Sequence, residues 1–191
     1  MLKTHNKIEK KNVLITGPPR TGKTTLIKKF VDFCISKNLK IGGIFTPEIR
    51  EGNIRAGFAI EDILTRKQAI MASMRLKTQN RVGKYGVDIK AVEEVGVEAI
   101  KNAIKTADII IIDEIGKMEL FSQQFQEVVK EALDSNKPVL GTIGKKLMHD
   151  FAKKIKTRPD INMIVLNRQQ KLDLLLSRLK SIYNIKEIIR R

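Results

Sequence analysis

The stretch NVLITGPPRTGKTTL, residues 12–26, decides the fold. Residues 13–16 form an apolar run typical of a buried strand, and a helical pattern begins at Lys23. Between them, Gly17 and Gly22 give the backbone the freedom that a tight loop requires. The spacing GxxxxGK followed by Ser or Thr, set between a strand and a helix, is the P-loop pattern. The sequence therefore predicts a phosphate-binding loop over residues 17–24.

Each part of this loop has a physical task. The backbone N–H groups from about Pro19 to Thr24 are expected to form a nest for phosphate oxygens, and the helix N-terminus adds partial positive charge. Lys23 is expected to reach the β- and γ-phosphates, and the Thr24 hydroxyl to hold Mg²⁺. Thr25 follows as a donor to the α-phosphate. The loop residues expected to bind nucleotide are Gly17, Pro18, Pro19, Arg20, Thr21, Gly22, Lys23, Thr24 and Thr25.

A second anchor for the metal is expected at the end of a neighbouring strand. The four isoleucines at 109–112 have the character of a fully buried strand, and Asp113 and Glu114 follow them directly. Ligands of open α/β sheets lie at this end of the strands. We therefore expect Asp113 to hold Mg²⁺ together with Thr24. Glu114 is expected to act as the general base that polarises the attacking water.

The other elements alternate between strand-like and helix-like patterns. Residues 64–86 have weak periodicity and are interpreted as an irregular excursion rich in basic residues. The alternation predicts an α/β fold with a doubly wound, mostly parallel sheet, and residues 41–63 predict a β-hairpin inserted into it. The expected strands are 13–16, 41–49, 54–63, 87–90, 108–114, 139–143 and 161–166. The expected helices are 23–37, 92–105, 122–134, 147–155 and a long final helix from Arg168.

Composition limits the class of protein. The chain has 191 residues, and we expect one P-loop domain over 1–191. Its longest apolar run is far shorter than the roughly 18 residues of a membrane span, so no membrane partner is expected. The basic segment 1–12 has no apolar stretch behind it, which argues against a secretory signal. The one cysteine, Cys34, permits no internal disulfide, so a buried thiol and a cytoplasmic location are expected.

At this point the sequence resembles a known family, the small nucleoside-triphosphatases first named from thermophiles. These are RecA-like P-loop proteins with cancer-related homologues in animals. The residues that carry the resemblance are GPPRTGKTTL, GIFTPEIREGNIRAGFAI, RVGKYGVDI, IIIIDEIGKMELFSQQF and KPVLGTI, in the order and spacing of the family. The chain departs from the pattern at Arg20-Thr21, where the family usually has Gly-Val. Arg20 must then take backbone angles that suit glycine, or the loop must differ.

The resemblance implies slow, Mg²⁺-dependent hydrolysis of ATP, GTP and other nucleoside triphosphates to the diphosphate and phosphate. It also implies a nucleotide site that combines the P-loop with the segment around the isoleucine strand. The residues of that segment are Ile109, Ile110, Ile111, Ile112, Asp113, Glu114, Ile115 and Gly116.

Several other residues have two interpretations each. A basic residue of the 64–86 excursion could act as an arginine finger, although a solvated loop is favoured for any single one. Lys117 is a candidate for the γ-phosphate or for pairing with Glu114. Tyr85 is more plausible as a packed anchor than as a base-stacking ring, and Arg168 either contacts nucleotide or caps the last helix. Glu48 and Arg50 are candidate lining residues without an assigned role. The finger candidates are Arg66, Lys67, Arg75, Lys77, Arg81 and Lys84.

Two alternative functions stay open at this point. The size, the P-loop and the basic excursion also fit a nucleotide or nucleoside kinase-like phosphotransferase, although no acceptor-binding motif is evident. A formal net charge of +16, from 37 basic and 21 acidic residues, fits an RNA-binding ATPase switch. Nucleic acid is thus a second candidate partner beside nucleoside triphosphates. A monomer is expected.

Overall fold

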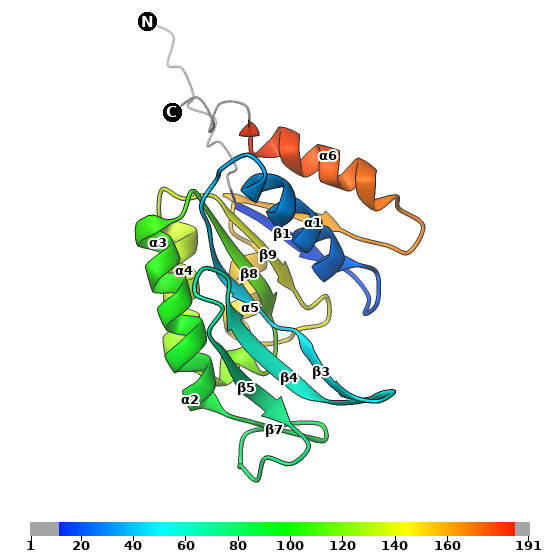
Figure 1. Ribbon diagram of the computed structural model, residues 1–191, viewed down its shortest axis with the longest axis vertical. Helices are drawn as coiled ribbons and strands as arrows, with labels where there is room; N and C mark the ends of the chain where they lie inside the picture. The colour runs from blue at the N-terminus through cyan, green and yellow to red at the C-terminus, as the bar shows by residue number, and fades with distance from the viewer. Residues whose placement is uncertain (1–11, 186–191) are drawn as a thin grey trace, which may run out of the picture.

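A ten-stranded sheet forms the centre of the computed structural model, which describes residues 12–185 (Figure 1). The strand order is β10-β1-β9-β8-β2-β4-β5-β7-β6, and β3 pairs with β4. The first five strands of this order run parallel to one another. They are β10 (Ile161–Val165), β1 (Asn12–Thr16), β9 (Val139–Ile143), β8 (Ile109–Ile115) and β2 (Ile41–Phe45). This half of the sheet confirms the predicted α/β fold.

The other half of the sheet is antiparallel. The predicted hairpin exists as β3 and β4, but three further strands continue the sheet beyond it. The antiparallel strands are β3 (Glu48–Glu51), β4 (Ile54–Asp62), β5 (Gln68–Ser73), β6 (Arg81–Val82) and β7 (Tyr85–Val87). The interpretation of 64–86 as irregular is therefore wrong. In β5, the exposed Ile70 precedes two buried residues, so the strand lacks the alternation that a sequence pattern needs.

Two other strand boundaries need correction. The predicted strand 41–49 is broken at Thr46 and Pro47, since proline has no N–H to donate to a ladder. The predicted strand 87–90 is wrong, because β7 ends at Val87 and a helix begins at Ile89. That helix starts with an N-cap, in which the Asp88 side chain accepts a hydrogen bond from Ala91 N–H.

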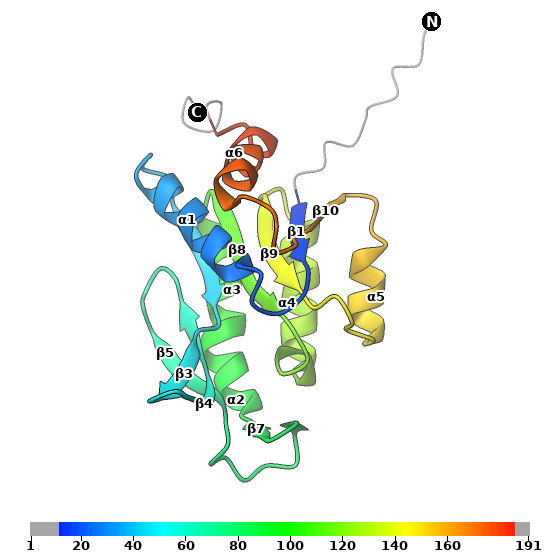
Figure 2. The same ribbon diagram turned by 90° about the vertical axis from the view of Figure 1, so that its right-hand side faces the viewer.

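Helices cover both faces of the parallel strands. Helices α1 and α6 pack on one face, and α3, α4 and α5 pack on the other (Figures 1 and 2). A π-helical stretch, η1 (Val92–Val97), connects α2 to α3, and a 3₁₀ turn, η2 (Glu119–Phe121), precedes α4. The helices are α1 (Lys23–Ile35), α2 (Ile89–Ala91), α3 (Glu98–Thr106), α4 (Gln123–Asp134), α5 (Asp150–Lys156) and α6 (Leu172–Ile182).

The strand sequences explain the two cores. In β8, Ile109 and Ile111 face the α1 and α6 side, whereas Ile110 and Ile112 face the α3 and α4 side. Because side chains alternate along a strand, a run of isoleucines fills both cores at once. Cys34 is buried in the first core as expected, and burial raises the pKa of its thiol to about 12.

The last helix begins later than the sequence predicted. Two local hydrogen bonds form here: Gln170 Oε1 accepts from Asn167 N–H, and Asn167 Oδ1 accepts from Gln169 N–H. They close a turn in front of the helix, which itself begins at Leu172. The side chain of Arg168 is exposed in this turn.

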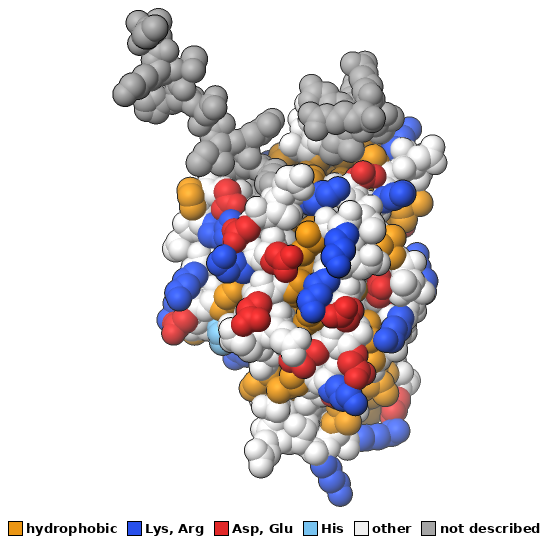
Figure 3. All heavy atoms as spheres, turned by 90° about the vertical axis from the view of Figure 1, so that its left-hand side faces the viewer, with side chains coloured by type: hydrophobic (Ala, Val, Ile, Leu, Met, Phe, Trp, Pro, Cys, Tyr) orange, Lys and Arg blue, Asp and Glu red, His pale blue; other side chains and the backbone are white. Residues whose placement is uncertain are grey.

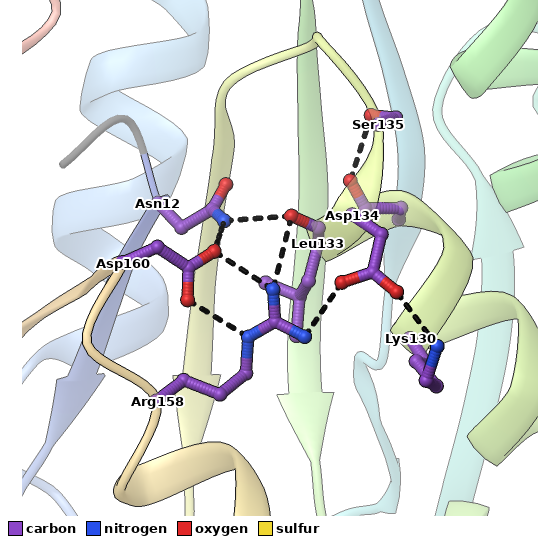
Figure 4. Close-up of polar contacts among 8 residues, drawn as sticks. Asn12, Lys130, Leu133, Asp134, Ser135, Arg158 and Asp160 are labelled. Atoms are coloured by element: carbon purple, nitrogen blue, oxygen red, sulfur yellow. Dashed lines mark hydrogen bonds and ion pairs between the residues drawn. The ribbon is translucent and has the colours of Figure 1, made fainter. Parts of the chain in front are cut away.

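An ion-pair network ties the start of β1 to α4 and β10 (Figure 4). Arg158 lies 2.7 Å from Asp134 and 2.8 Å from Asp160. Asn12 donates to Asp160 and to the carbonyl of Leu133. The network fixes the start of β1, and the P-loop departs from the opposite end of the same strand.

The basic N-terminal segment, read as lacking a secretory signal, lies outside the described residues apart from Asn12. No helix within residues 12–185 has the length and apolar character that crossing a membrane requires.

Candidate functional site

The P-loop curls between the end of β1 and the start of α1. Gly17 has a φ of 152°, and a Cβ built there would stand 2.2 Å from the carbonyl oxygen of Leu166. Gly22 has a φ of 89° in the position before the first helical residue. Both sites therefore require glycine, one for close approach and one for left-handed backbone. The side chains of Pro18 and Pro19 in this loop are exposed.

Arg20 resolves the question that its departure from the family pattern raised. Its φ is 61°, in the left-handed region where the family usually has glycine. Its side chain is exposed, and the next residue, Thr21, is buried and donates its hydroxyl to Pro18 O at 3.0 Å. The loop thus keeps its turn at Arg20 and carries an added, exposed positive charge.

Lys23 lies against the loop that precedes it. Its Nζ donates to the carbonyl oxygens of Gly17 at 3.2 Å and Pro18 at 2.9 Å. The ammonium group is therefore held at the loop by two weak acceptors that a phosphate oxygen can replace. Thr24 and Thr25, which open the first turn of α1, are exposed.

The end of β8 meets the start of α1. Asp113 is 1% exposed, and its Oδ1 accepts from the hydroxyl of Thr24 at 3.3 Å and from that of Thr142 at 3.1 Å. Its Oδ2 is buried and has no hydrogen-bond partner among residues 12–185. Burial raises the pKa of this carboxyl above its ordinary value, while the two hydroxyls oppose the shift. The structure thus brings together the two residues that the sequence predicted as metal ligands.

This arrangement fits a magnesium ion. Mg²⁺ takes oxygen ligands and in nucleotide sites is held by one or two protein groups in addition to phosphates. An orphaned carboxylate oxygen beside a threonine hydroxyl at a P-loop supplies such groups. No group of three His, Cys, Asp or Glu side chains that could hold a metal occurs within 12–185. A site with few protein ligands therefore suits this chain better than an all-protein cage.

Glu114 lies next to this pair. Its Oε1 is 3.4 Å from the point where a Cβ of Gly116 would stand and 4.0 Å from the corresponding point at Gly144. Burial and then the charge of Asp113 raise the pKa of Glu114. A half-buried carboxylate bordered by two glycines, with a raised pKa, has the properties of a general base.

The isoleucines of β8 contribute to the site indirectly. Ile109, Ile110, Ile111, Ile112 and Ile115 are all fully buried in the two cores. Their side chains hold β8 between the helical layers. Their contribution to the site is the fixed position of Asp113 and Glu114.

Two threonines of the site were missed by the sequence analysis. Thr142, at the end of β9, orients the Asp113 carboxylate, and Thr46, just after β2, donates to the main-chain oxygen of Asp113 at 2.6 Å. Both lie at the carboxyl ends of the parallel strands that flank β8. The rule that used strand ends to select Asp113 could have selected them as well.

The remaining candidates, the basic residues of segment 64–86 and Lys117, form contacts with other residues or are exposed. Arg66 pairs with Glu61, Arg75 pairs with Glu51, and Arg81 donates to the carbonyls of Leu76 and Lys84. The side chains of Lys67, Lys77 and Lys84 are exposed. In the part of the chain from 12 to 185, no ion pair joins the exposed Lys117 to Glu114.

Tyr85 is a packed anchor, as the sequence analysis favoured. It is 7% exposed, its ring meets that of Phe58 edge-on, and it exchanges hydrogen bonds with Arg55. Glu48 accepts from Arg55 and from Arg50, at 2.8 and 2.9 Å. Glu48 and Arg50 therefore brace the β3–β4 hairpin.

Comparison with known proteins gives consistent matches. The family model described as NTPase matches residues 12–179. The chain is 46% identical over 164 residues to "Nucleoside-triphosphatase THEP1" of Thermotoga maritima, covering 85% of this chain and 90% of that protein. The crystal structure of THEP1 from Aquifex aeolicus matches with a TM-score of 0.80 at 34% identity, covering 90% and 98% of the two chains. The solution structure of a human cancer-related nucleoside triphosphatase matches with a TM-score of 0.76 at 31% identity, covering 91% and 97%.

Proposed function

The chain belongs to the NTPase family, and from this premise we propose that it is a Mg²⁺-dependent nucleoside-triphosphatase of broad nucleotide specificity. The products are the nucleoside diphosphate and phosphate. The observation that carries the proposal is the contact between the Thr24 hydroxyl and the buried Asp113 carboxylate, with Glu114 next in the chain. We also propose that residues 1–191 form one domain of this kind.

The reaction assigns a task to each residue. Thr24 and Asp113 would hold Mg²⁺, which supplies positive charge to the triphosphate when bound. Lys23 leaves the loop carbonyls and binds phosphate oxygens. Glu114 accepts a proton from the attacking water as the oxygen bonds to the γ-phosphorus. The bond from that phosphorus to the β–γ bridging oxygen breaks, and the diphosphate leaves with its electron pair.

Broad specificity follows from the kind of contact that this site offers. The residues assigned to the ligand, from Gly17 to Thr25 with Asp113, address phosphates and metal. A triphosphate held in this way contributes most of the binding energy, so the identity of the base has little influence. The names of the relatives, which say nucleoside-triphosphatase without naming a base, are consistent with this.

Release of free phosphate tests the proposal. The purified protein is mixed with Mg²⁺ and, separately, ATP, GTP, CTP and UTP, with Lys23→Ala as the blank. We expect slow release from all four nucleotides, no release without Mg²⁺ and none from the variant. Faster transfer of labelled phosphate to a nucleoside or nucleoside monophosphate than to water would support the phosphotransferase instead.

The RNA switch is tested in the same assay. Its basis is the net charge of +16. On the face drawn in Figure 3, however, Lys and Arg side chains lie among Asp and Glu side chains, so that face carries no single-sign field. We expect phosphate release to be unchanged by added RNA. Stimulation that disappears as salt is raised would favour the switch.

A further inference from the structure

Glu119 is a buried acid that the proposed reaction has not used. It begins the 3₁₀ turn η2, five residues after Glu114, and is 3% exposed. Buried carboxyl groups are rare unless they are paired or functional. The ion pairs formed within residues 12–185 do not include Glu119.

The Glu119 carboxyl shares one space with that of Glu114. A Cβ built on Gly116 would stand 2.8 Å from Glu119 Oε2 and 3.4 Å from Glu114 Oε1. Both carboxyl groups therefore lie over the same face of Gly116, which has no side chain to separate them. The backbone of Gly116 and of Glu119 itself partly opposes the rise in the pKa of the Glu119 carboxyl.

The turn that carries Glu119 is firmly attached. Leu120 N–H donates to Gly116 O at 3.2 Å, and Ser122 N–H donates to Glu119 O at 3.1 Å. From α4, the Gln126 amide donates to Leu120 O at 3.0 Å. The backbone of Glu119 is thus tied at one end to the loop after β8 and at the other to α4.

The surroundings of Glu119 keep it neutral near pH 7. Burial raises its pKa to about 8, and the charges of Glu114 and Asp113, from β8, act in the same direction. From the other elements, η1 presents Glu93, which accepts a hydrogen bond from Ser122 at 2.8 Å, and the loop carries the exposed Lys117. A neutral carboxyl has an O–H to donate, and a neighbouring carboxylate is a strong acceptor.

We propose that Glu119 is a positioning residue for hydrolysis, which fixes the Glu114 carboxylate beside Gly116 so that one of its oxygens faces the attacking water. This inference rests on the proposed function of the site. In this proposal Glu119 acts through Glu114 and does not touch the nucleotide itself. Its removal is therefore expected to lower kcat while leaving KM and nucleotide affinity nearly unchanged.

Two variants of Glu119 test the proposal, with Glu127→Gln on the exposed face of α4 as the matched control. Glu119→Leu keeps the burial but has no donor, and we expect kcat to fall about 30-fold or more, with KM within twofold. Glu119→Gln keeps the shape and a neutral donor, and we expect kcat at pH 7 within about fivefold of the wild type. The control is expected to match the wild type.

The pH profile separates positioning from a purely structural role. In the wild type, kcat is expected to fall above about pH 8, because ionised Glu119 stops donating and places a second negative charge beside Glu114. Glu119→Gln is expected to lack this fall. The profile of Glu119→Gln decides the question even where Glu119→Leu does not fold.

The outcomes also distinguish the two proposals. Wild-type kcat and pH profile in both Glu119 variants, with Lys23→Ala inactive, would overturn the positioning role and leave the nucleoside-triphosphatase intact. A wild-type protein that releases no phosphate from any nucleotide would overturn both.

Discussion

The burial of Glu119 leads to a quantitative prediction for the pH dependence of the free energy of unfolding. In the folded chain its pKa is about 8, against an ordinary value of 4.5. An acid whose pKa is raised by folding stabilises the folded state below the unfolded pKa, and this contribution is lost as pH rises towards the folded pKa. At about 1.4 kcal/mol for each pH unit, the interval from 4.5 to about 8 corresponds to a loss on the order of 5 kcal/mol.

The substitution Glu119→Gln removes this titration and little else. The variant is expected to have about the stability of the wild type near pH 4.5 and to exceed it increasingly up to about pH 8. The assay is urea unfolding followed by circular dichroism at one-unit steps from pH 5 to pH 9, with Glu127→Gln in parallel. Equal pH dependence of the unfolding free energy in the wild type and in Glu119→Gln would show that folding does not raise the pKa of Glu119.

Three further substitutions test other parts of the structure. Thr142→Val removes one of the two hydroxyl donors to the buried Asp113. We expect the free energy of unfolding to fall by about 1–3 kcal/mol and phosphate release to require a higher Mg²⁺ concentration. If neither quantity changed, the contact between Thr142 and Asp113 would be contradicted. Gly43→Ala places a Cβ 2.0 Å from the carbonyl oxygen of Ile111 at a φ of 112°. Calorimetry is expected to show that the free energy of unfolding falls by about 3 kcal/mol and the melting temperature by about 6–12 °C. An unchanged melting temperature would show that the backbone of Gly43 does not lie so close to the Ile111 carbonyl. Arg158→Met removes a half-buried ion-pair network. We expect the free energy of unfolding to fall by about 1–2 kcal/mol, and by less in high salt. A loss of stability that does not depend on salt would indicate that the Arg158 side chain acts through packing instead.

The parts of the site that are local in sequence were predictable. The P-loop spacing fixes the positions of Gly17, Lys23 and Thr24 within one strand–turn–helix unit, so no tertiary information is needed. Asp113 was predictable because a four-isoleucine strand must be buried and its end must lie at the ligand-binding edge. The contact between Thr24 and Asp113, 3.3 Å across 89 residues, follows from the two rules together.

The parts that depend on pairing and register were not predictable in the same way. Strand β5 receives its backbone partners from β4 and β7, and its own residues carry no alternating pattern. The last helix starts at Leu172 because the bonds of Asn167 and Gln170 close a turn instead of a helix. The burial of Glu119 is decided by the fold of the loop after β8, and the sequence shows there only an ordinary glutamate between apolar residues.

In the proposed reaction, hydrolysis depends on Glu114, which lies beside Asp113 and the P-loop. The most direct measurement is single-turnover phosphate release from Mg²⁺-ATP by Glu114→Gln, together with the affinity of the same variant for the nucleotide. We expect an affinity within about threefold of the wild type and phosphate release slowed at least about 100-fold, since the base is lost and the binding residues remain. Phosphate release at the wild-type rate would contradict the role of Glu114 as general base and require another residue to activate the water.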